Sequence, residues 1–166
     1  VKTIMQYARL NKGDRFPLKI KNFRPILTDR GDKAGIAEGH YFHQDIWAAK
    51  KIFQKNPNKH IDIGSRIDGF ISHLLSFRTV EVVDIRPITS DVEGLGFIQA
   101  DATAMSGFDD DSIVSISSLH AVEHFGLGRY GDDVNPEACF LAMKSLQRVL
   151  AHGGVLYFSL PIGIER

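Results

Sequence analysis

The segment "HIDIGSRIDGF", residues 60–70, decides the fold of this 166-residue chain. A short apolar run with the character of a β-strand ends at an aspartate and a glycine, and a second apolar run begins at Phe70. Gly64 lets the backbone pass close to a ligand, and Ser65 leads toward the amino end of a helix, where backbone N–H groups have no partner. A strand, a tight loop and a helix in this order are typical of a ligand-binding turn in an α/β protein.

Strand-like and helix-like segments alternate along the rest of the chain. The strand-like segments are rich in β-forming residues and lie at residues 60–64, 79–85, 96–101, 112–118 and 153–161. Segments with helical character lie at residues 44–54, 68–77 and 135–154. Strands that alternate with helices are joined by right-handed crossovers. We therefore predict a Rossmann-like, doubly wound α/β fold with a mostly parallel sheet and helices on both faces.

The helix expected at residues 135–154 has the clearest boundary signals. Asn135 can cap it, and Pro136 suits its first turn. Gly153 suits its end, after a stripe of apolar residues.

Composition and charge limit the classes of partner that the chain can have. Lys plus Arg and Asp plus Glu both number 20, so the net charge gives no general attraction to nucleic acid or to acidic membranes. No apolar run is long enough to span a bilayer or to resemble a signal segment. The lone Cys139 cannot form an internal disulfide, which fits a reducing compartment. We therefore expect a cytoplasmic protein with no membrane partner and no nucleic-acid partner.

The N-terminal part differs in composition from the rest. Residues 1–40 mix charged residues, Gly and Pro with scattered apolar residues, and they show no sustained hydrophobic period. A chain of this length can bury one core but hardly two. We expect an irregular N-terminal extension at residues 1–40, followed by one domain at residues 41–166.

Two aspartates end the strand-like segments that follow the loop. Asp84 lies 20 residues after Gly64, where a carboxylate can accept hydrogen bonds from both hydroxyls of a ribose. Asp101 ends the next segment, and beside the backbone N–H of Ala102 it can read the edge of an adenine. A single aspartate at a strand end is more often a cap or a turn former. The three features on successive strands together predict an adenosine site.

The loop residues distinguish two cofactors that contain adenosine. A dinucleotide pyrophosphate needs bare glycine backbone, as in the pattern G-x-G-x-x-G, whereas this loop carries Arg66 and Asp68 at such positions. Asp68 repels phosphates, while Asp62 and Asp68 attract the ammonium and sulfonium groups of S-adenosylmethionine. The charges favour S-adenosylmethionine, and a nicotinamide oxidoreductase is the disfavoured alternative.

The ordered motifs resemble those of class I S-adenosylmethionine-dependent methyltransferases. The segments that carry this resemblance are "HIDIGSRIDGF", "VEVVDIRP", "FIQADAT", "SSLHAVEHFGLGRYGD" and "RVLAHGGVLYFSLPIG". More closely, the chain is similar to an uncharacterised methyltransferase-like family that shares segments of the types "HYFHQDIWAA", "GSRIDGF" and "EHFGLGRYGD". The similarity covers about residues 40–163.

The resemblance implies where S-adenosylmethionine contacts the chain. It puts Asp62 and Gly64 beside the methionine part and Asp84 on the ribose. It puts Ile85 against the adenine face and residues 101–102 on the adenine edge. The full set of expected cofactor contacts is Asp62, Gly64, Ser65, Arg66, Asp84, Ile85, Asp101, Ala102 and Ser118.

Two features depart from the pattern of that superfamily. Arg66 and Asp68 replace glycines of the usual nucleotide loop. The usual sheet also ends in an antiparallel hairpin after the fifth strand, and this chain stops before it. We therefore expect a domain that lacks the hairpin and is incomplete at its C-terminus.

The segment "HAVEH" matches the pattern H-x-x-E-H of a zinc-peptidase signature. On a helix, His120 and His124 share a face and can chelate a metal with a third ligand, so a zinc hydrolase that uses them with Glu123 is one alternative. The neighbouring glycines favour a tight loop instead, and methyltransferase-like sequences commonly carry an "EH" pair here. In that interpretation we expect no metal. Because an imidazole titrates near neutral pH, His120 suits a general base for an acceptor hydroxyl, or it packs beside the donor.

Two further segments keep open interpretations. Tyr41 or Gln44 can reach over the donor as a lid, or their helix can pack on the sheet through Trp47. Residues 129–133 can shape an acceptor site, or they can pair with one another in solvent.

Together these observations predict an S-adenosylmethionine-dependent methyltransferase. We expect it to act on a small-molecule or glycan acceptor at oxygen, with His120 and Glu123 as catalytic residues. A non-catalytic S-adenosylmethionine-binding scaffold is the second hypothesis, and the zinc hydrolase is the third.

Overall fold

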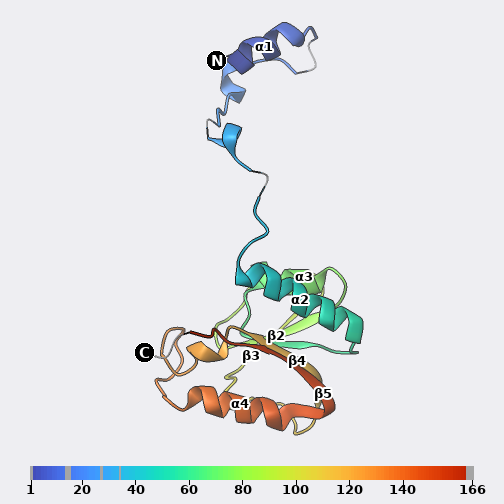
Figure 1. Ribbon diagram of the computed structural model, residues 1–166, viewed down its shortest axis with the longest axis vertical. Coiled ribbons are helices and arrows are strands. Elements are labelled where there is room, and N and C mark those ends of the chain that lie inside the picture. The colour runs from blue at the N-terminus through green and yellow to red at the C-terminus, as the bar shows by residue number, and fades with distance from the viewer. Residues whose placement is uncertain (1, 14–15, 27, 34, 164–166) are drawn as a thin grey trace. The chain divides into compact units, whose positions relative to one another are not determined.

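The computed structural model describes residues 2–13, 16–26, 28–33 and 35–163 (Figure 1). Contacts within the chain divide it into two units, Val1–Ala37 and Glu38–Arg166. The sequence interpretation places its boundary after residue 40.

The first unit contains a helix that the sequence interpretation did not predict. Helix α1 spans Lys2–Leu10, and single 3-10 turns follow at Ile20–Asn22 and Asp29–Gly31. No residue of α1 is buried. Its apolar residues recur every three or four positions, but 9 residues give too short a period to stand out beside the Gly and Pro that follow.

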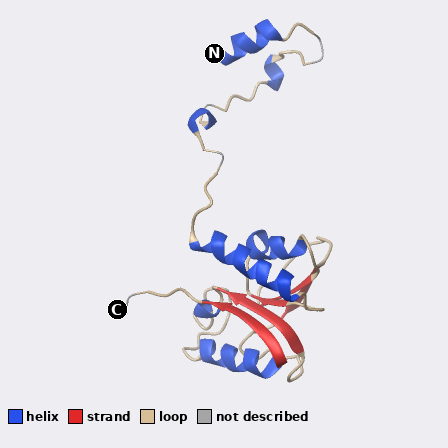
Figure 2. Ribbon diagram, turned by 45° about the vertical axis from the view of Figure 1, so that its right-hand side comes forward, coloured by secondary structure: helices blue, strands red, loops and turns tan. Residues whose placement is uncertain are grey.

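The second unit is built on one parallel sheet (Figure 2). Its strand order is β3-β2-β1-β4-β5, and every neighbouring pair is parallel. The strands are β1 (Ile61–Ile63), β2 (Val80–Asp84), β3 (Leu95–Gln99), β4 (Ile113–Leu119) and β5 (Leu150–Ser159). The order reverses between β1 and β4, as in doubly wound folds, so the predicted α/β fold class is confirmed.

Helices cover both faces of this sheet (Figures 1 and 2). On one face, α2 (His40–Lys55), a π-helical turn (Ile67–Ile71) and α3 (Ser72–Leu75) pack through a core that includes Ile52, Leu74 and Val82. On the other face, α4 (Ala138–Val149) packs through Leu146 and Val149 onto Ile61, Ile63 and Ile116. Successive strand residues point to opposite faces, which is how one strand contributes to both cores.

The C-terminal boundary of α4 differs from the prediction. The helix ends at Val149, and β5 begins at Leu150, which pairs with Ile113 of β4. Gly153 instead adopts a φ of 75° within β5, where the register between β4 and β5 shifts. The amino end also differs, because α4 begins at Ala138 with Glu137 at the N-cap and no side-chain cap. The Asn135 side chain accepts a hydrogen bond from the backbone N–H of Glu137 at 2.9 Å in the turn before the helix.

This arrangement determines where a ligand can bind. Because all five strands are parallel, their carboxyl ends meet at one edge of the sheet. The loops that leave β1, β2, β3 and β4 therefore lie together at that edge. Within the described ranges, no helix combines the length and the apolar character that a membrane crossing requires.

Candidate active site

A pocket of about 170 Å³ lies at the carboxyl ends of β1, β2 and β3. Gly64 borders it from the loop after β1, and Asp84 and Asp101 border it from the ends of β2 and β3. Apolar side chains, among them Ile63, Val83, Ile85, Ala102 and Phe125, form much of its wall. The structure thus brings together five predicted cofactor contacts: Gly64, Asp84, Ile85, Asp101 and Ala102.

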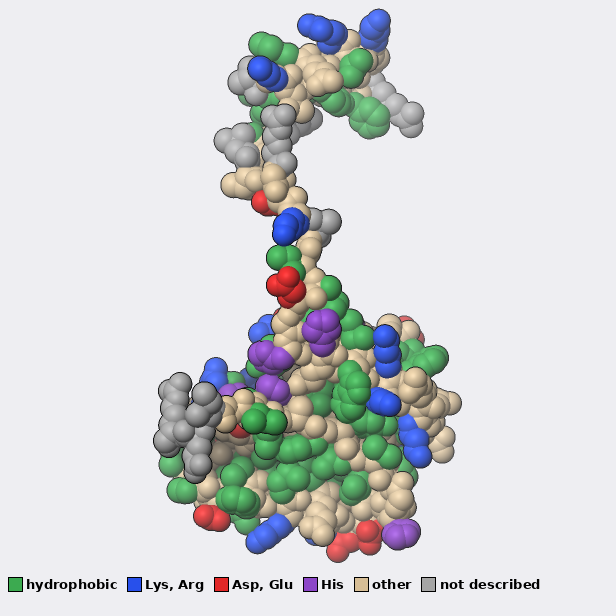
Figure 3. Space-filling view, in the orientation of Figure 1, with side chains coloured by type: hydrophobic (Ala, Val, Ile, Leu, Met, Phe, Trp, Pro, Cys, Tyr) green, Lys and Arg blue, Asp and Glu red, His purple; other side chains and the backbone are tan. Residues whose placement is uncertain are grey.

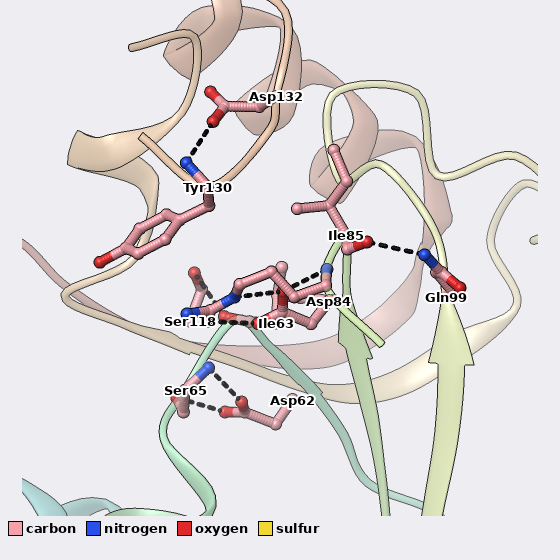
Figure 4. Close-up of polar contacts among 10 residues, drawn as sticks. Asp62, Ile63, Ser65, Asp84, Ile85, Gln99, Ser118, Tyr130 and Asp132 are labelled. Carbon is pink, nitrogen blue, oxygen red and sulfur yellow. Dashed lines mark hydrogen bonds and ion pairs between the residues drawn. The ribbon is translucent and has the colours of Figure 1, made fainter. Parts of the chain in front are cut away.

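Asp84 is bonded to a cation of its own chain at the pocket wall (Figure 4). Its Oδ1 accepts from the backbone N–H and the Nε of Arg86 at 2.8 and 2.9 Å, and its Oδ2 accepts from Arg86 Nη2 at 2.6 Å. This bonding raises the pKa of Arg86. The guanidinium also lies over the Tyr130 ring, 4.3 Å from its centroid. Sequence reasoning missed this cation, although it stands two residues after Asp84.

Asp101 is held by the turn that follows β3. Its Oδ1 accepts a hydrogen bond from the Thr103 backbone N–H at 2.8 Å, and its backbone carbonyl accepts one from Met105 at 2.9 Å. Gln99 Nε2 donates to the backbone carbonyl of Ile85 at 2.9 Å, which ties the loop after β2 to β3 (Figure 4). These bonds fix the wall on which the adenine contacts were predicted.

Asp62 of β1 and Ser65 of the loop after it do not border the pocket. Asp62 is fully buried, and its carboxylate accepts from the Ser65 N–H at 3.0 Å, the Ser65 Oγ at 2.9 Å and the Ser117 Oγ at 2.5 Å. Burial raises the pKa of Asp62 to about 6, although these hydrogen bonds oppose the shift. Asp62 therefore shapes the loop from within the protein (Figure 4).

The loop itself requires glycine at position 64. Gly64 has a φ of 76°, and its N–H donates to the Val83 carbonyl at 2.9 Å. A Cβ at this position would lie 3.1 Å from the Cβ of Ala121. The loop after β1 and the loop after β4 therefore pack against each other.

The other two predicted cofactor contacts lie outside the pocket. The Arg66 side chain is 82% exposed and pairs with Asp68 through bonds of 3.0 and 2.7 Å. Ser118 is fully buried in β4, and its Oγ donates to the Ile63 carbonyl at 3.4 Å.

His120 and Glu123 follow β4 and face each other. His120 has a φ of 51°, a strained value for a residue other than glycine, and its N–H donates to the Ser159 carbonyl at 3.1 Å. Its Nδ1 lies 3.7 Å from Glu123 Oε1. Glu123 Oε2 is buried with no hydrogen-bond partner within the described part of the chain. Buried carboxylate oxygens normally have a hydrogen-bond partner, and Glu123 does not line the pocket described above.

The start of α2 contacts His120 through two rings. His40 stacks on the imidazole with a centroid distance of 5.3 Å, and Tyr41 meets it edge-on at 5.2 Å. Gln44 accepts a hydrogen bond from Ser159 Oγ at 2.8 Å. Histidine side chains gather on this part of the surface of the second unit (Figure 3). The helix thus both packs on the sheet and reaches the candidate catalytic histidine.

The metal-binding geometry of the zinc hydrolase alternative does not form. His120 follows the end of β4, and residues 122–124 form a single 3-10 turn, so His120 and His124 do not lie one turn apart on an α-helix. The His124 ring instead meets the Tyr130 ring edge-on, with ring centroids 6.0 Å apart. Among the described residues, no three His, Cys, Asp or Glu side chains are placed to hold a metal ion.

The loop at residues 126–135 forms the remaining wall of the pocket, and Asp132 organises it. The Asp132 carboxylate accepts hydrogen bonds from the backbone N–H groups of Gly126, Gly128 and Tyr130 at 2.7, 3.2 and 3.1 Å. These bonds lower the pKa of Asp132. The sequence left the role of this segment open, and its repeated glycines followed by an aspartate are the signal that indicates such a turn.

Comparison with known proteins relates the fold to two solved structures. One is a chain from the complex between the Haloferax volcanii methyltransferase activator Trm112 and its methyltransferase partner, with 18% identity and a TM-score of 0.45. The other is described as a methyltransferase from an antibiotic biosynthesis pathway of Anabaena variabilis, with 19% identity and a TM-score of 0.47. The matches cover 70% and 69% of this chain but only 59% and 44% of those chains.

The sequence was compared with curated proteins and with family models. A search of curated proteins found no match to this chain. A family model described as "Caenorhabditis protein of unknown function, DUF268" matches residues 77–166, which is more than half of the chain and includes β2 to β5. The protein therefore belongs to the DUF268 family.

Proposed function

We propose that this protein is an S-adenosylmethionine-dependent methyltransferase that acts on a hydroxyl of a small-molecule or glycan acceptor. One observation carries the proposal: Asp84 and Asp101, at the ends of neighbouring parallel strands, border the same pocket beside Gly64. We also keep a cytoplasmic location as a proposal, which rests on the low cysteine content.

The pocket fits the nucleoside end of this cofactor. Its apolar wall, with Ile85 and Ala102, suits an adenine ring, and Asp101 lies where it can accept a hydrogen bond from an exocyclic amino group. Asp84 is 8% exposed, and among the described residues its carboxylate bonds only to Arg86. Because the Arg86 side chain is 44% exposed, it can withdraw into water when ribose hydroxyls replace it on Asp84.

The charges around the loop favour a cationic donor over a dinucleotide. Gly64 and Gly126 are the described glycines that border the pocket, and the charge of Asp68 is balanced by Arg66 outside it. The charged residues that line the pocket are four aspartates and one arginine: Asp84, Asp101, Asp132, Asp133 and Arg86. Glu123 contributes a buried carboxylate oxygen that lacks a partner among the described residues. A positively charged ammonium or sulfonium gains from these acids, whereas a pyrophosphate is repelled by them.

The residues proposed for catalysis adjoin the donor loop. The bound cofactor supplies a methyl group on a sulfonium, and its transfer to the acceptor oxygen breaks the carbon–sulfur bond. His120 takes the hydroxyl proton, and Glu123, 3.7 Å from His120 Nδ1, stabilises the resulting imidazolium. The packing of Ala121 against Gly64 keeps this pair beside the loop.

Calorimetric titration with S-adenosylhomocysteine, S-adenosylmethionine and NAD tests the proposal. We expect the first two to bind and NAD to bind at least tenfold more weakly. Asp101→Ala is expected to weaken S-adenosylhomocysteine binding about tenfold, because it removes one hydrogen bond to a charged group. Asp109→Ala, an exposed aspartate in the turn before β4, is the matched control and should bind normally.

Tighter binding of NAD, or equal binding by Asp101→Ala and wild type, contradicts the proposal. Turnover separates an enzyme from the non-catalytic scaffold. A panel of hydroxylated acceptors with labelled S-adenosylmethionine is expected to give methylated product in the wild type and none in His120→Ala. Donor binding without methylation of any acceptor supports the scaffold instead.

A further inference from the structure

A continuous row of buried polar side chains runs beneath the donor loop. His60, directly before β1, is 1% exposed, and its Nδ1 lies 2.8 Å from Ser115 Oγ. Its Nε2 lies 2.9 Å from Ser117 Oγ, which bonds to Asp62 at 2.5 Å. Asp62 in turn accepts both hydrogen bonds of Ser65. Polar groups this deep in a parallel sheet are costly unless every one is satisfied, so their continuity needs an explanation.

The row follows one face of two neighbouring strands. Residues 60 and 62 point to the same side because strand residues alternate, and so do residues 115 and 117. Asp62 pairs in register with Ser117. The row therefore begins inside the sheet and ends at Ser65, next to the glycine that borders the pocket.

Each hydrogen bond in the row has a direction. An ionised Asp62 can only accept, so Ser117 uses its one proton on Asp62 and accepts from His60 Nε2–H. His60 Nδ1 then accepts from Ser115. This arrangement satisfies every group with a neutral imidazole, and burial supports it because burial lowers the pKa of His60 to about 3.

We propose that this row is a positioning device for the donor loop, with His60 as a positioning residue that acts through Ser117 and Asp62. The inference rests on the proposed role of the loop in donor binding. His60 touches no ligand; it orients Ser117, which holds the Asp62 carboxylate against the Ser65 N–H. Among the described residues, Asp45 of α2 acts electrostatically on Asp62 and Arg78 acts on His60. The Tyr157 ring of β5 also faces His60, with ring centroids 6.2 Å apart.

Ser117→Ala tests the row, with Ser115→Ala as its matched control. Both changes remove one buried hydroxyl bonded to His60, so both should lower the unfolding temperature by similar amounts. Only Ser117→Ala removes a bond to Asp62. We expect it to speed hydrogen exchange of the Ser65 amide about tenfold and to weaken S-adenosylhomocysteine binding about tenfold, with less than threefold change in Ser115→Ala.

The pH dependence of Ser65 hydrogen exchange is a second measurement, which a purely structural role of the row would leave unchanged. Loss of the Ser117 bond raises the pKa of Asp62 further, so the pH at which Ser65 exchange accelerates should rise in Ser117→Ala and stay constant in Ser115→Ala. His60→Phe should show the same direction with a smaller effect. Nitrogen NMR of the His60 ring is expected to show the neutral form at pH 6 and the proton on Nε2 at pH 8, where Asp62 is ionised.

The outcomes separate this inference from the proposed function. If Ser117→Ala leaves Ser65 exchange and its pH midpoint at the wild-type values, the positioning role is overturned. A charged His60 ring at pH 6, or a proton on Nδ1 at pH 8, overturns the direction of the row. If Ser65 responds as expected but the wild type binds no S-adenosylhomocysteine, the proposed function fails and the coupling between row and loop stands.

Discussion

Asp62 lies within β1 and Asp84 ends the neighbouring strand β2, and their surroundings differ. Asp62 pairs in register with Val82, so it lies two residues short of the level of Asp84 and is enclosed by the sheet. Its partners are neutral serines, whereas Asp84 borders the pocket and its partner is Arg86. The carboxyl edge therefore has a region fixed by internal bonds, at β1 and β4, and a region open to exchange with a ligand, at β2 and β3.

Asp62→Ala should have the largest effect, and on stability. It leaves the Ser65 N–H and two serine hydroxyls without their acceptor in a buried place, which costs about 3 kcal/mol. Urea unfolding measures this loss. Asp62→Asn is the matched control, because its amide keeps the shape and one acceptor oxygen and should lose much less. Equal unfolding free energies of wild type and Asp62→Ala would falsify the claim that bonds to Asp62 fix the sheet edge at β1 and β4.

Asp84→Ala should reduce ligand affinity more than it reduces stability. We expect S-adenosylhomocysteine affinity to fall about 30-fold, which corresponds to about 2 kcal/mol for hydrogen bonds to a charged group. The unfolding free energy should change far less than in Asp62→Ala, because the released Arg86 side chain is 44% exposed and water can solvate it. Calorimetry and urea unfolding of the same two variants compare the regions directly. Unchanged affinity contradicts the proposal that Asp84 exchanges its bond to Arg86 for bonds to the ligand.

The pH dependence of stability should change when Asp62 is neutralised. The pKa of His60 falls from 6.5 to about 3 in the folded chain, so His60 lowers stability as pH falls through this window. The pKa of Asp62 rises from 3.8 to about 6, so the folded chain takes up the Asp62 proton first and stability gains as pH falls. Between about pH 4 and 6 the two contributions oppose each other.

Asp62→Asn removes one of these contributions and leaves the other unopposed. Its stability should therefore fall on acidification more steeply than that of the wild type, by up to about 1.4 kcal/mol per pH unit for one proton. Urea unfolding at half-unit steps from pH 4.5 to 6 measures the slope. Asp109→Asn, on the surface, should keep the wild-type slope, and an identical slope in Asp62→Asn contradicts the assignment of this proton to Asp62.

Arg66→Ala should have the smallest effect. The sequence placed Arg66 among the cofactor contacts, but its side chain is 82% exposed and paired with Asp68 outside the pocket. We expect the affinity for S-adenosylhomocysteine to change less than threefold and the unfolding temperature to stay constant, because exposed pairs contribute little. Calorimetry checks this expectation. A large loss of affinity means that the loop moves Arg66 onto the ligand when the donor binds.

Most of the fold follows from local patterns. The segments predicted at residues 79–85, 96–101 and 112–118 coincide with β2, β3 and β4 within one or two residues at either end. Period-two alternation and β-branched residues act over a few positions, so a single sequence reveals them. The predicted end of α4 was wrong because it depends on residues far apart in the sequence. Leu150 pairs with Ile113 of β4, so the helix ends before Gly153, where the sequence predicted its end.

Some contacts of the candidate site could likewise be predicted from the sequence, and others could not. Gly64, Asp84 and Asp101 could be predicted as neighbours because the carboxyl ends of parallel strands meet at one edge. The stacking of Arg86 on Tyr130 could not, because these residues lie on separate loops and their contact depends on how the chain returns to the sheet edge.

The sequence by itself determined the alternation of strands and helices, the turn after β1 and the order in which acidic residues reach the sheet edge. Only the tertiary structure decided which acid turns inward. Asp62 is enclosed by Ser117, 55 residues away, and Asp84 is held by a side chain two residues away that water can replace. Strand residue types are local, but burial and hydrogen-bond partners depend on strand register, and register is a property of the whole sheet.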